Sequence, residues 1–363
     1  MQWKPLRLLL IGPLPPPLGG ATVSFKCLVD SLGKRDDVEI IVVSTSDRAG
    51  RLFVRVRRVL RTFYNVIRHL GRVDVISLYL STSGLPLVGS VAAGLTSLWK
   101  QPLIIHKFGG TDYHRYRLVR RWLAKWALQN ADIYLAQTKE LVKLAHKDHI
   151  LQAKWFPNSR PIGDIPEVTS RNNTCRKFVF VSQVCMDKGV REIIDAGERF
   201  GSDVAVDIYG PLCDGFTEQS FAGLKRVKYK GSLAPESVIP TLCSYDALLL
   251  PTYHQNEGYS GIVIEAYLAG LPVICTRWGA LPEIADDSCA ILIEPKNSDE
   301  LYKAMKKLAE DDQLWKRLCE GAIAKRDFFN MERRVDEFVG YCRELAAGVS
   351  FKSGQGAELN ISD

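Results

Sequence analysis

The chain has 363 residues, of which 46% are hydrophobic and 25% are charged. This composition is typical of a globular protein and excludes collagen-like, mucin-like and wholly disordered chains. The length exceeds what one hydrophobic core usually supports, so we expect two α/β domains. The net charge of +7 is unevenly placed: residues 1–170 contain 25 Lys and Arg against 12 Asp and Glu, and the remainder contains 23 against 29.

Two segments of the first half, residues 51–72 and 115–125, concentrate the basic residues and place apolar and aromatic residues between them. Such a face attracts anionic lipid headgroups, nucleic acid or a phosphorylated acceptor. A solvated helix face is the alternative interpretation, and the sequence leaves both open.

The cysteine pattern and the apolar segments bear on the compartment. Nine scattered cysteines without a C-x-x-C pair argue against a disulfide framework and a zinc site, and favour a reduced cytosolic compartment. The apolar run after Lys4 and Arg7 is too short for a signal peptide and is interrupted by prolines. No charge occurs between Asp74 and Lys100, which is long enough for a membrane span, but Ser, Gly and Pro predict a strand and a helix there instead.

In chain order, short apolar runs alternate with segments of helical period, as in βαβ units around a parallel sheet. The first half predicts one doubly wound domain, followed by an interdomain linker at residues 157–177 that is rich in Pro, Ser and Asn. The predicted strands are 6–11, 39–44, 73–79, 103–106 and 132–137, and the predicted helices are 22–32, 53–70, 85–99 and 115–129.

A second alternating series follows the predicted linker and ends in three helices. Because ligands of such sheets bind beyond the carboxyl ends of the strands, residues at those ends are the candidates for chemistry. The predicted strands are 178–182, 205–209, 227–230, 247–250, 273–276 and 290–293, and the predicted helices are 189–200, 236–244, 262–269, 298–310, 313–329 and 332–345.

The most informative segment is residues 251–284, PTYHQNEGYSGIVIEAYLAGLPVICTRWGALPEI. We expect Glu257 in a glycine-containing loop and Glu265 in the first turns of a helix. The amides of residues 259–261 would then begin that helix, where unpaired N–H groups and the helix dipole hold phosphate oxygens. Carboxylates accept hydrogen bonds from sugar hydroxyls on either side of such a site. Two glutamates that only cap or solubilise a helix are the alternative.

This segment resembles the donor-binding motif of retaining glycosyltransferase family 4, with EGYSGIVIE as its Glu-x7-Glu element, followed by AYLAGLPVICT and LPEI. The resemblance implies the GT-B fold, an α/β architecture of two Rossmann-like doubly wound domains that face each other across a cleft. It implies that Glu257 contacts the donor sugar as a catalytic residue and that Glu265 binds the ribose. Tyr259, Ser260 and Gly261 would meet the diphosphate.

The resemblance extends along the rest of the chain. In VFVSQVCMDKG, Lys188 matches a diphosphate-binding lysine, whereas Gln183 stands where the family has an arginine and carries no charge. This departure calls for a compensating cation elsewhere. In VDIYGPLCDG, Gly210 matches a glycine at a strand end that the donor approaches closely.

The first half carries weaker matches to the same family. In PPPLGGATVS, Gly20 would approach the donor and Gly19 would lie on the acceptor side. In LIIHKFGGTDYH, His106 would assist catalysis by donating to a sugar hydroxyl, and Asp112 would lie on the acceptor side, although extra residues separate His106 from Gly110. A buried structural histidine is the alternative for His106.

Together these features predict an acceptor-binding domain at 1–160 that includes a crossover helix at about 331–347, a donor-binding domain at 176–330 and a flexible tail at 348–363. The predicted function is transfer of a sugar, with retention, from a nucleotide diphosphate sugar to a saccharide or lipid-linked saccharide. The predicted setting is surface polysaccharide biosynthesis, such as lipopolysaccharide or capsule, in the cytoplasm, with a peripheral site on the inner membrane face.

We expect no cofactor beyond the nucleotide sugar as co-substrate and no nucleic acid partner. The absence of a D-x-D triplet favours a metal-independent enzyme. Two other classes stay open. A non-catalytic nucleotide-sugar-binding protein would explain Gln183, and an NAD-dependent oxidoreductase would share the α/β domains but lacks its G-x-G-x-x-G loop here.

Overall fold

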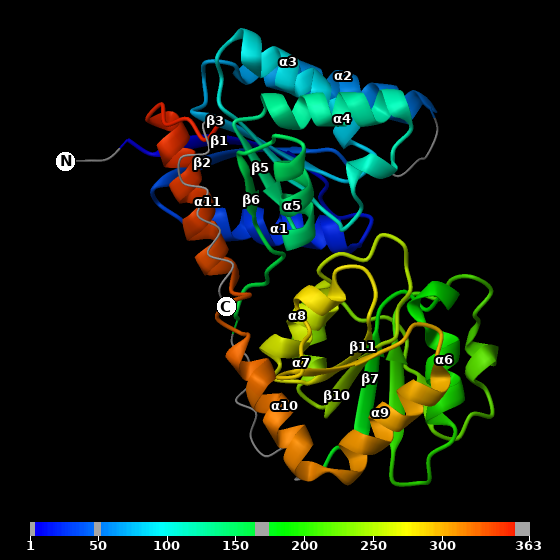
Figure 1. Ribbon diagram of the computed structural model, residues 1–363. Coiled ribbons are helices and arrows are strands. Elements are labelled where there is room, and N and C mark those ends of the chain that lie inside the picture. The colour runs from blue at the N-terminus through cyan, green and yellow to red at the C-terminus, as the bar shows by residue number, and fades with distance from the viewer. Residues whose placement is uncertain (1–3, 47–51, 164–173, 353–363) are drawn as a thin grey trace. The chain divides into compact units, whose positions relative to one another are not determined.

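The computed structural model describes residues 4–46, 52–163 and 174–352. The chain divides into two compact units, each built around its own six-stranded parallel sheet (Figure 1). Unit 1 comprises residues 1–157 and 331–363, and unit 2 comprises residues 158–330.

The sheet of unit 1 has the strand order β2-β1-β3-β4-β5-β6, so the direction in which successive strands are added to the parallel sheet reverses between β1 and β3. Apolar residues fill almost every strand position, as expected for parallel strands that are covered on both faces. The strands are β1 (Leu6–Gly12), β2 (Val38–Ser44), β3 (Val75–Leu80), β4 (Leu103–Lys107), β5 (Ile133–Ala136) and β6 (Ala153–Trp155).

Two hydrophobic cores lie on the two faces of this sheet. Alternate residues of β1 point to opposite faces, so that Leu8 and Leu10 belong to one core and Leu9 and Ile11 to the other. The first core is covered by α1 (Gly20–Leu32) and α11 (Met331–Ala346). The second is covered by α2 (Leu52–His69), α3 (Ser90–Leu98), α4 (Leu118–Asn130) and α5 (Lys139–Lys147), of which α2, α3 and α4 lie side by side in Figure 1.

The strand order of unit 2, β12-β11-β10-β7-β8-β9, is that of a Rossmann fold, with the reversal between β7 and β10. The strands are β7 (Lys177–Val181), β8 (Ala205–Tyr209), β9 (Val227–Tyr229), β10 (Ala247–Leu250), β11 (Val273–Thr276) and β12 (Ala290–Ile293). The helices are α6 (Val190–Gly197), α7 (Val238–Leu242), α8 (Gly261–Leu268), α9 (Ser298–Glu310) and α10 (Asp312–Ala324).

Short helical turns join these elements. A π-helical turn, η1 (Leu85–Gly89), precedes α3, so residues 85–99 are not one α-helix as the apolar period predicts. The 3-10 turns are η2 (Tyr113–Arg115), η3 (Met186–Lys188), η4 (Glu218–Phe221), η5 (Pro235–Ser237) and η6 (Leu281–Glu283). Within the described residues, no helix combines the length and the apolar character that crossing a bilayer requires.

Three further features differ from the predictions made from the sequence. Strand β6 and helix α5 were not predicted, because β6 has three residues and α5 mixes four charged residues with its apolar ones. In the predicted linker, residues 157–160 are buried, and residues 164–173 lie outside the described part of the chain. In the predicted tail, Phe351 is buried against Tyr341 in the core of unit 1, and residues 353–363 lie outside the description.

Candidate functional site

The loops that follow β7 and β10 meet at the point where the strand order of unit 2 reverses. Lys188 ends the turn after β7, and Glu257 lies in the loop after β10. Lys188 Nζ lies 2.5 Å from Glu257 Oε2, and the two side chains are 13% and 7% exposed. Thr252 Oγ1 donates to the same carboxylate oxygen at 2.9 Å. Glu257, predicted to contact the donor sugar, and Lys188, predicted to bind the diphosphate, therefore form one buried ion pair.

Gly189 allows these two loops to approach so closely. Its φ is +78°, a conformation that side chains disfavour, and an added Cβ would lie 2.3 Å from the carbonyl oxygen of Pro251. The backbone after Lys188 thus packs directly against the end of β10. This contact places the lysine beside the glutamate loop.

Helix α8 begins at Gly261, with Ser260 as its N-cap residue. Glu265 lies in the first turns of this helix, as predicted, and its side chain is 15% exposed. Its Oε1 atom accepts a hydrogen bond from Arg160 Nε at 2.6 Å. No sequence pattern predicts this contact, because Arg160 lies in the segment predicted as the interdomain linker.

The loop before α8 is held from several directions. Tyr259 is 1% exposed, and its hydroxyl donates to Glu283 Oε2 at 2.8 Å. Asn158 Nδ2 donates to the carbonyl oxygen of Tyr259 at 3.2 Å. The first N–H groups of a helix have no partners within the helix, so this fixed loop presents donors at the start of α8. Such a helix start suits an anionic group.

The other predicted donor residues of unit 2 lie at the ends of β7 and β8. Gly210 has a φ of +138°, and a Cβ there would lie 1.7 Å from the carbonyl oxygen of Ser182. Tyr229 donates a hydrogen bond to the Gly210 carbonyl oxygen at 2.9 Å. Gln183 follows Ser182 and is exposed. Gly210 is therefore required by the neighbouring backbone itself, whatever ligand approaches it.

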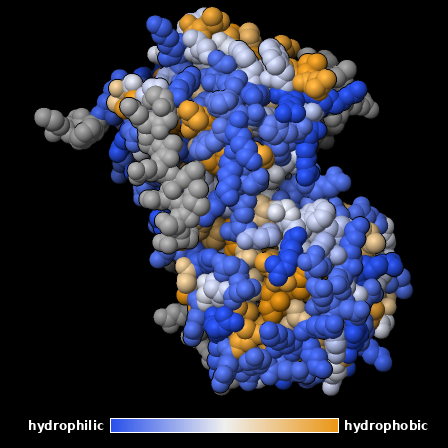
Figure 2. Space-filling model, in the orientation of Figure 1, coloured by the Kyte–Doolittle hydropathy of each residue, from blue (hydrophilic) through white to orange (hydrophobic). Residues whose placement is uncertain are grey.

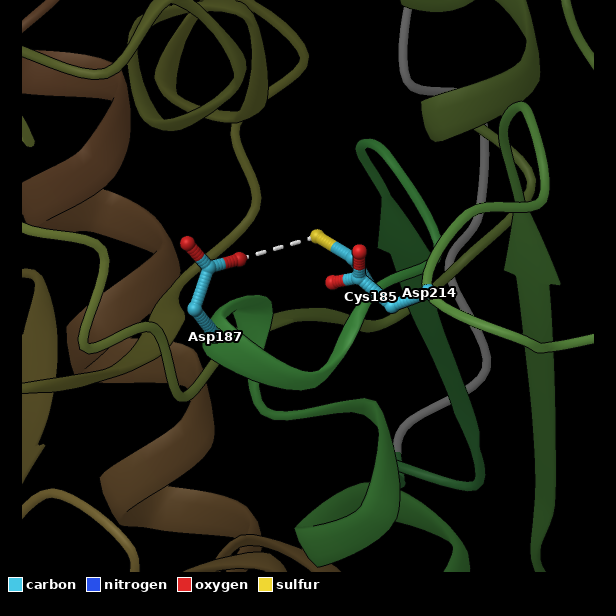
Figure 3. A group of neighbouring side chains, drawn as sticks. All are labelled: Cys185, Asp187 and Asp214. Carbon is cyan, nitrogen blue, oxygen red and sulfur yellow. Dashed lines mark hydrogen bonds between the residues drawn. The ribbon is translucent and has the colours of Figure 1, made fainter.

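A second group of polar residues surrounds Asp187, next to Lys188. The thiol sulfur of Cys185 and one carboxylate oxygen each of Asp187 and Asp214 lie within 4.8 Å of one another (Figure 3). The Cys185 thiol donates to Asp187 Oδ1 at 2.9 Å, and His254 Nδ1 lies 2.5 Å from Asp187 Oδ2. Burial, reinforced by Asp187, raises the pKa of Cys185 to about 12, so its thiol stays protonated near neutral pH. Burial alone would raise the pKa of Asp187, but the Cys185 and His254 hydrogen bonds lower it.

In unit 1, His106 lies within β4 and is 6% exposed. Its ring packs edge-on against Tyr79 and Phe156, with centroids 4.4 and 5.0 Å away, and its buried Nδ1 atom has no hydrogen-bond partner. Burial lowers the pKa of His106 to about 3. The imidazole is therefore neutral at physiological pH, which allows it to share a hydrogen bond but not to act as a cationic acid.

The remaining acceptor-side candidates are engaged locally. Asp112 caps the turn η2: it accepts a hydrogen bond from the His114 amide at 3.0 Å and lies 2.8 Å from His114 Nδ1. Gly19 is the N-cap of α1 and Gly20 its first residue, so the predicted glycine loop is the start of a helix. A Cβ on Gly20 would lie 3.3 Å from the Phe108 ring, whereas the space around Gly19 is open.

Most of unit 2 matches a known protein family. Residues 175–311 match the family described as glycosyl transferases group 1. These residues make up most of unit 2 and are similar to a group 1 glycosyltransferase domain. They contain every element of the Lys188, Glu257 and Glu265 arrangement, whereas Asn158 and Arg160 precede the match.

Two curated relatives match part of the chain. MMP alpha-(1->4)-mannosyltransferase of Mycolicibacterium hassiacum is 31% identical over 139 residues, which are 36% of this chain and 33% of the relative. N-acetylgalactosamine-N,N'-diacetylbacillosaminyl-diphospho-undecaprenol 4-alpha-N-acetylgalactosaminyltransferase of Campylobacter jejuni is 34% identical over 87 residues, which are 23% and 24% of the two chains. The matches span a third or less of the length of these relatives.

Solved structures match over nearly the whole chain. Anabaena HepE in complex with UDP superimposes with a TM-score of 0.71 at 17% identity, covering 93% of this chain and 100% of HepE. The complex of HepE with UDP-glucose superimposes with a TM-score of 0.69 at 17% identity, covering 92% of this chain and 99% of HepE. At this identity the likeness concerns the fold, and the predicted GT-B fold of two Rossmann-like units is confirmed.

Proposed function

We propose that this protein is a glycosyltransferase that moves a sugar from a nucleoside diphosphate sugar to a saccharide or lipid-linked saccharide acceptor. The observation that carries the proposal is the buried Lys188–Glu257 pair at the reversal point of the unit 2 sheet. Glu265 follows in the first turns of α8, and all three residues lie in the segment that matches the group 1 glycosyl transferases.

In this proposal the diphosphate rests on the amides at the start of α8. When the bond between sugar and phosphate breaks, negative charge accumulates on the leaving diphosphate. Lys188 and the helix start stabilise that charge, and their stabilisation is effective because the site is fixed before the reaction. Glu257 contacts the transferred sugar, and Glu265 binds the ribose hydroxyls. Retention of anomeric configuration is proposed on the family resemblance.

The proposed acceptor and pathway are supported by the name of one relative and by the charge of the first half of the chain. The name of the Campylobacter jejuni relative describes a diphospho-undecaprenol-linked acceptor. A lipid-linked acceptor would suit the basic first half of this chain. We therefore propose a role in surface polysaccharide biosynthesis at the cytoplasmic face of a membrane.

The decisive experiment measures donor binding and turnover together. The purified protein is screened against UDP-, GDP- and ADP-sugars by thermal shift, because a ligand that binds only the folded form raises its melting temperature. Donors that bind are then incubated with saccharide and lipid-linked acceptors, and release of nucleoside diphosphate is recorded. A protein that binds no nucleotide sugar contradicts the proposal.

A second candidate function has one observation in its favour. Gln183 stands at the position of the family's phosphate-binding arginine and is exposed. A nucleotide-sugar-binding protein without turnover would tolerate the loss of that charge. Tight donor binding without transfer or hydrolysis, across the whole acceptor panel, would favour this second function.

Metal independence gives a direct prediction. Lys188 and the amides at the start of α8 supply the positive potential that a divalent ion supplies in metal-dependent transferases. We therefore expect EDTA to leave the rate of nucleoside diphosphate release unchanged. A rate that falls on chelation and returns with Mg²⁺ would show that a metal ion takes part.

The surface over α2, α3 and α4 supports a membrane partner. Between residues 52 and 131 the only acidic residues are Asp74 and Asp112, whereas Lys and Arg are abundant. Large apolar side chains are exposed on the same helices, and Figure 2 shows hydrophobic residues among hydrophilic ones on this part of unit 1. They are Leu60, Phe63, Tyr64 and Ile67 on α2, Leu98 on α3, and Leu118, Val119 and Trp122 on α4.

We predict that the protein binds anionic vesicles through this surface. Apolar side chains insert at the headgroup boundary while arginines attract anionic lipid, and each basic residue near the surface contributes about 1 kcal/mol. Cosedimentation with phosphatidylglycerol vesicles should exceed that with phosphatidylcholine vesicles, and it should weaken in high salt and in Trp122→Ser. Equal binding to both vesicle types would contradict the prediction.

A further inference from the structure

Arg160 occupies an unusual position for an arginine in the segment between two domains. It is 4% exposed, and its Nε and Nη1 atoms both donate hydrogen bonds. Nε donates to Glu265 Oε1 at 2.6 Å. Nη1 donates to Asn158 Oδ1 at 2.9 Å and to the Ser159 carbonyl oxygen at 3.0 Å.

The third nitrogen, Nη2, lies against the first residue of α8. A Cβ on Gly261 would be 2.1 Å from this atom, so only glycine leaves room for the guanidinium there. The same segment also holds the preceding loop, because Asn158 donates to the Tyr259 carbonyl oxygen. Residues 158–160 therefore fix both the loop that contains Glu257 and the helix that contains Glu265.

Structural stability alone is a weak explanation for this arrangement. The start of a helix carries a partial positive charge, so a buried guanidinium beside it is unfavourable unless negative charge lies close by. Burying the pair with Glu265 also removes both charges from water, and well-packed apolar residues often serve stability as well or better. A charged pair at this place is better explained by what it does to Glu265.

We propose that Arg160 is a positioning residue that sets the preference of the donor site for ribonucleotides. The proposal rests on the proposed function, in which Glu265 binds the ribose. Arg160 holds Glu265 Oε1 through its hydrogen bond and so fixes the rotation of the carboxylate. The second oxygen, Oε2, is then directed to accept hydrogen bonds from the ribose hydroxyls. Without Arg160 the carboxylate would rotate, and the ribose contact would weaken.

The test compares ribonucleotides with 2′-deoxyribonucleotides as ligands. The probes are UDP, GDP and ADP with their 2′-deoxy forms, and the base that binds most tightly is used throughout. Binding to the full-length protein is measured by calorimetry. The native protein should favour the ribonucleotide by about ten- to a hundredfold, the value of a hydrogen bond to a charged group.

Three variants isolate the role of Arg160. In Arg160→Met the preference for the ribonucleotide should fall to within about threefold of unity, and Glu265→Gln should lower it similarly. The double variant should show no further loss, because residues that act through one contact are not additive. Arg160→Lys keeps the charge but loses the planar fork, so an intermediate ratio is expected. If Arg160→Met does not fold, the ribonucleotide preference of Arg160→Lys is compared with that of the native protein instead.

Arg334→Met provides the matched control. Arg334 is similarly buried, at 6% exposure, but it belongs to α11 of unit 1 and pairs with Glu337. The Arg334→Met variant should prefer the ribonucleotide to the same extent as the native protein. Circular dichroism of every variant establishes that the fold is retained.

The outcomes separate this inference from the proposed function. An unchanged ratio in folded Arg160 variants overturns the inference and leaves the glycosyltransferase proposal intact. Equal weakening of ribonucleotide and deoxyribonucleotide overturns it as well, because Arg160 would then act on the diphosphate, as a substitute for the charge missing at Gln183. If the native protein binds none of the probes, the proposed function itself fails and the inference falls with it.

Discussion

Replacing Glu257 by glutamine is expected to lower kcat for sugar transfer by about a hundred- to a thousandfold or more, the usual cost of removing one charged or hydrogen-bonding group from the reacting centre. Binding of the nucleoside diphosphate should change little, because the amide oxygen can still accept from Lys188 and Thr252. Glutamine is preferred to alanine, since alanine would leave a buried lysine without its partner. Initial rates at saturating donor and a separate binding isotherm measure the two effects.

The control for Glu257→Gln is Glu294→Gln. Glu294 belongs to the same unit, but its side chain is 58% exposed and forms a long ion pair of 3.7 Å with Arg277. Its turnover should match that of the native protein. If the Glu257 variant also turned over at the native rate, Glu257 would have no role in the transfer step.

Replacing Gly210 by alanine should destabilise unit 2 by about 3 kcal/mol or more, the sum of backbone strain and overpacking. The new Cβ would lie 1.7 Å from the Ser182 carbonyl oxygen, and the φ of +138° already disfavours a side chain. Since the contact atom is backbone, β7 and β8 must move apart. The expected fall in melting temperature is about 6–12 °C for a unit of this size. Differential scanning calorimetry measures it.

Gly215→Ala separates the clash from the backbone strain. Gly215 also has a positive φ, of +82°, but nothing lies within 4 Å of its Cβ position. Strain alone should lower the free energy of unfolding by about 1 kcal/mol, which corresponds to a fall in melting temperature of roughly 2–4 °C. Equal effects at the two positions would mean that the approach of Ser182 to Gly210 has little energetic weight.

Local patterns in the sequence were sufficient for most of the fold and for part of the site. Strands β8, β10, β11 and β12 have the predicted bounds, because short apolar runs between polar turns report burial directly. The lysine and the two glutamates follow from contiguous motifs, and the structure brings Lys188 and Glu257 into contact. Their roles in the reaction stay predictions.

Other features depend on which segments meet in space. Phe351 lies in a segment without periodicity, yet it is buried by packing against α11. His106 follows an apolar run like any strand residue. It is neutral because burial lowers its pKa, and Tyr79 and Phe156 pack against its ring. No pattern along the chain reports either environment.

Arg160 illustrates the limit most clearly. Its segment has the composition of a linker, and the nearest sequence signal is the missing charge at Gln183, which called for a cation without saying where. By itself the sequence determined two parallel α/β units, the strand ends that carry chemistry and the two glutamates, because these follow from local periodicity and contiguous motifs. Only the tertiary structure placed a guanidinium from position 160 beside a carboxylate at 265, because that contact joins residues 105 positions apart.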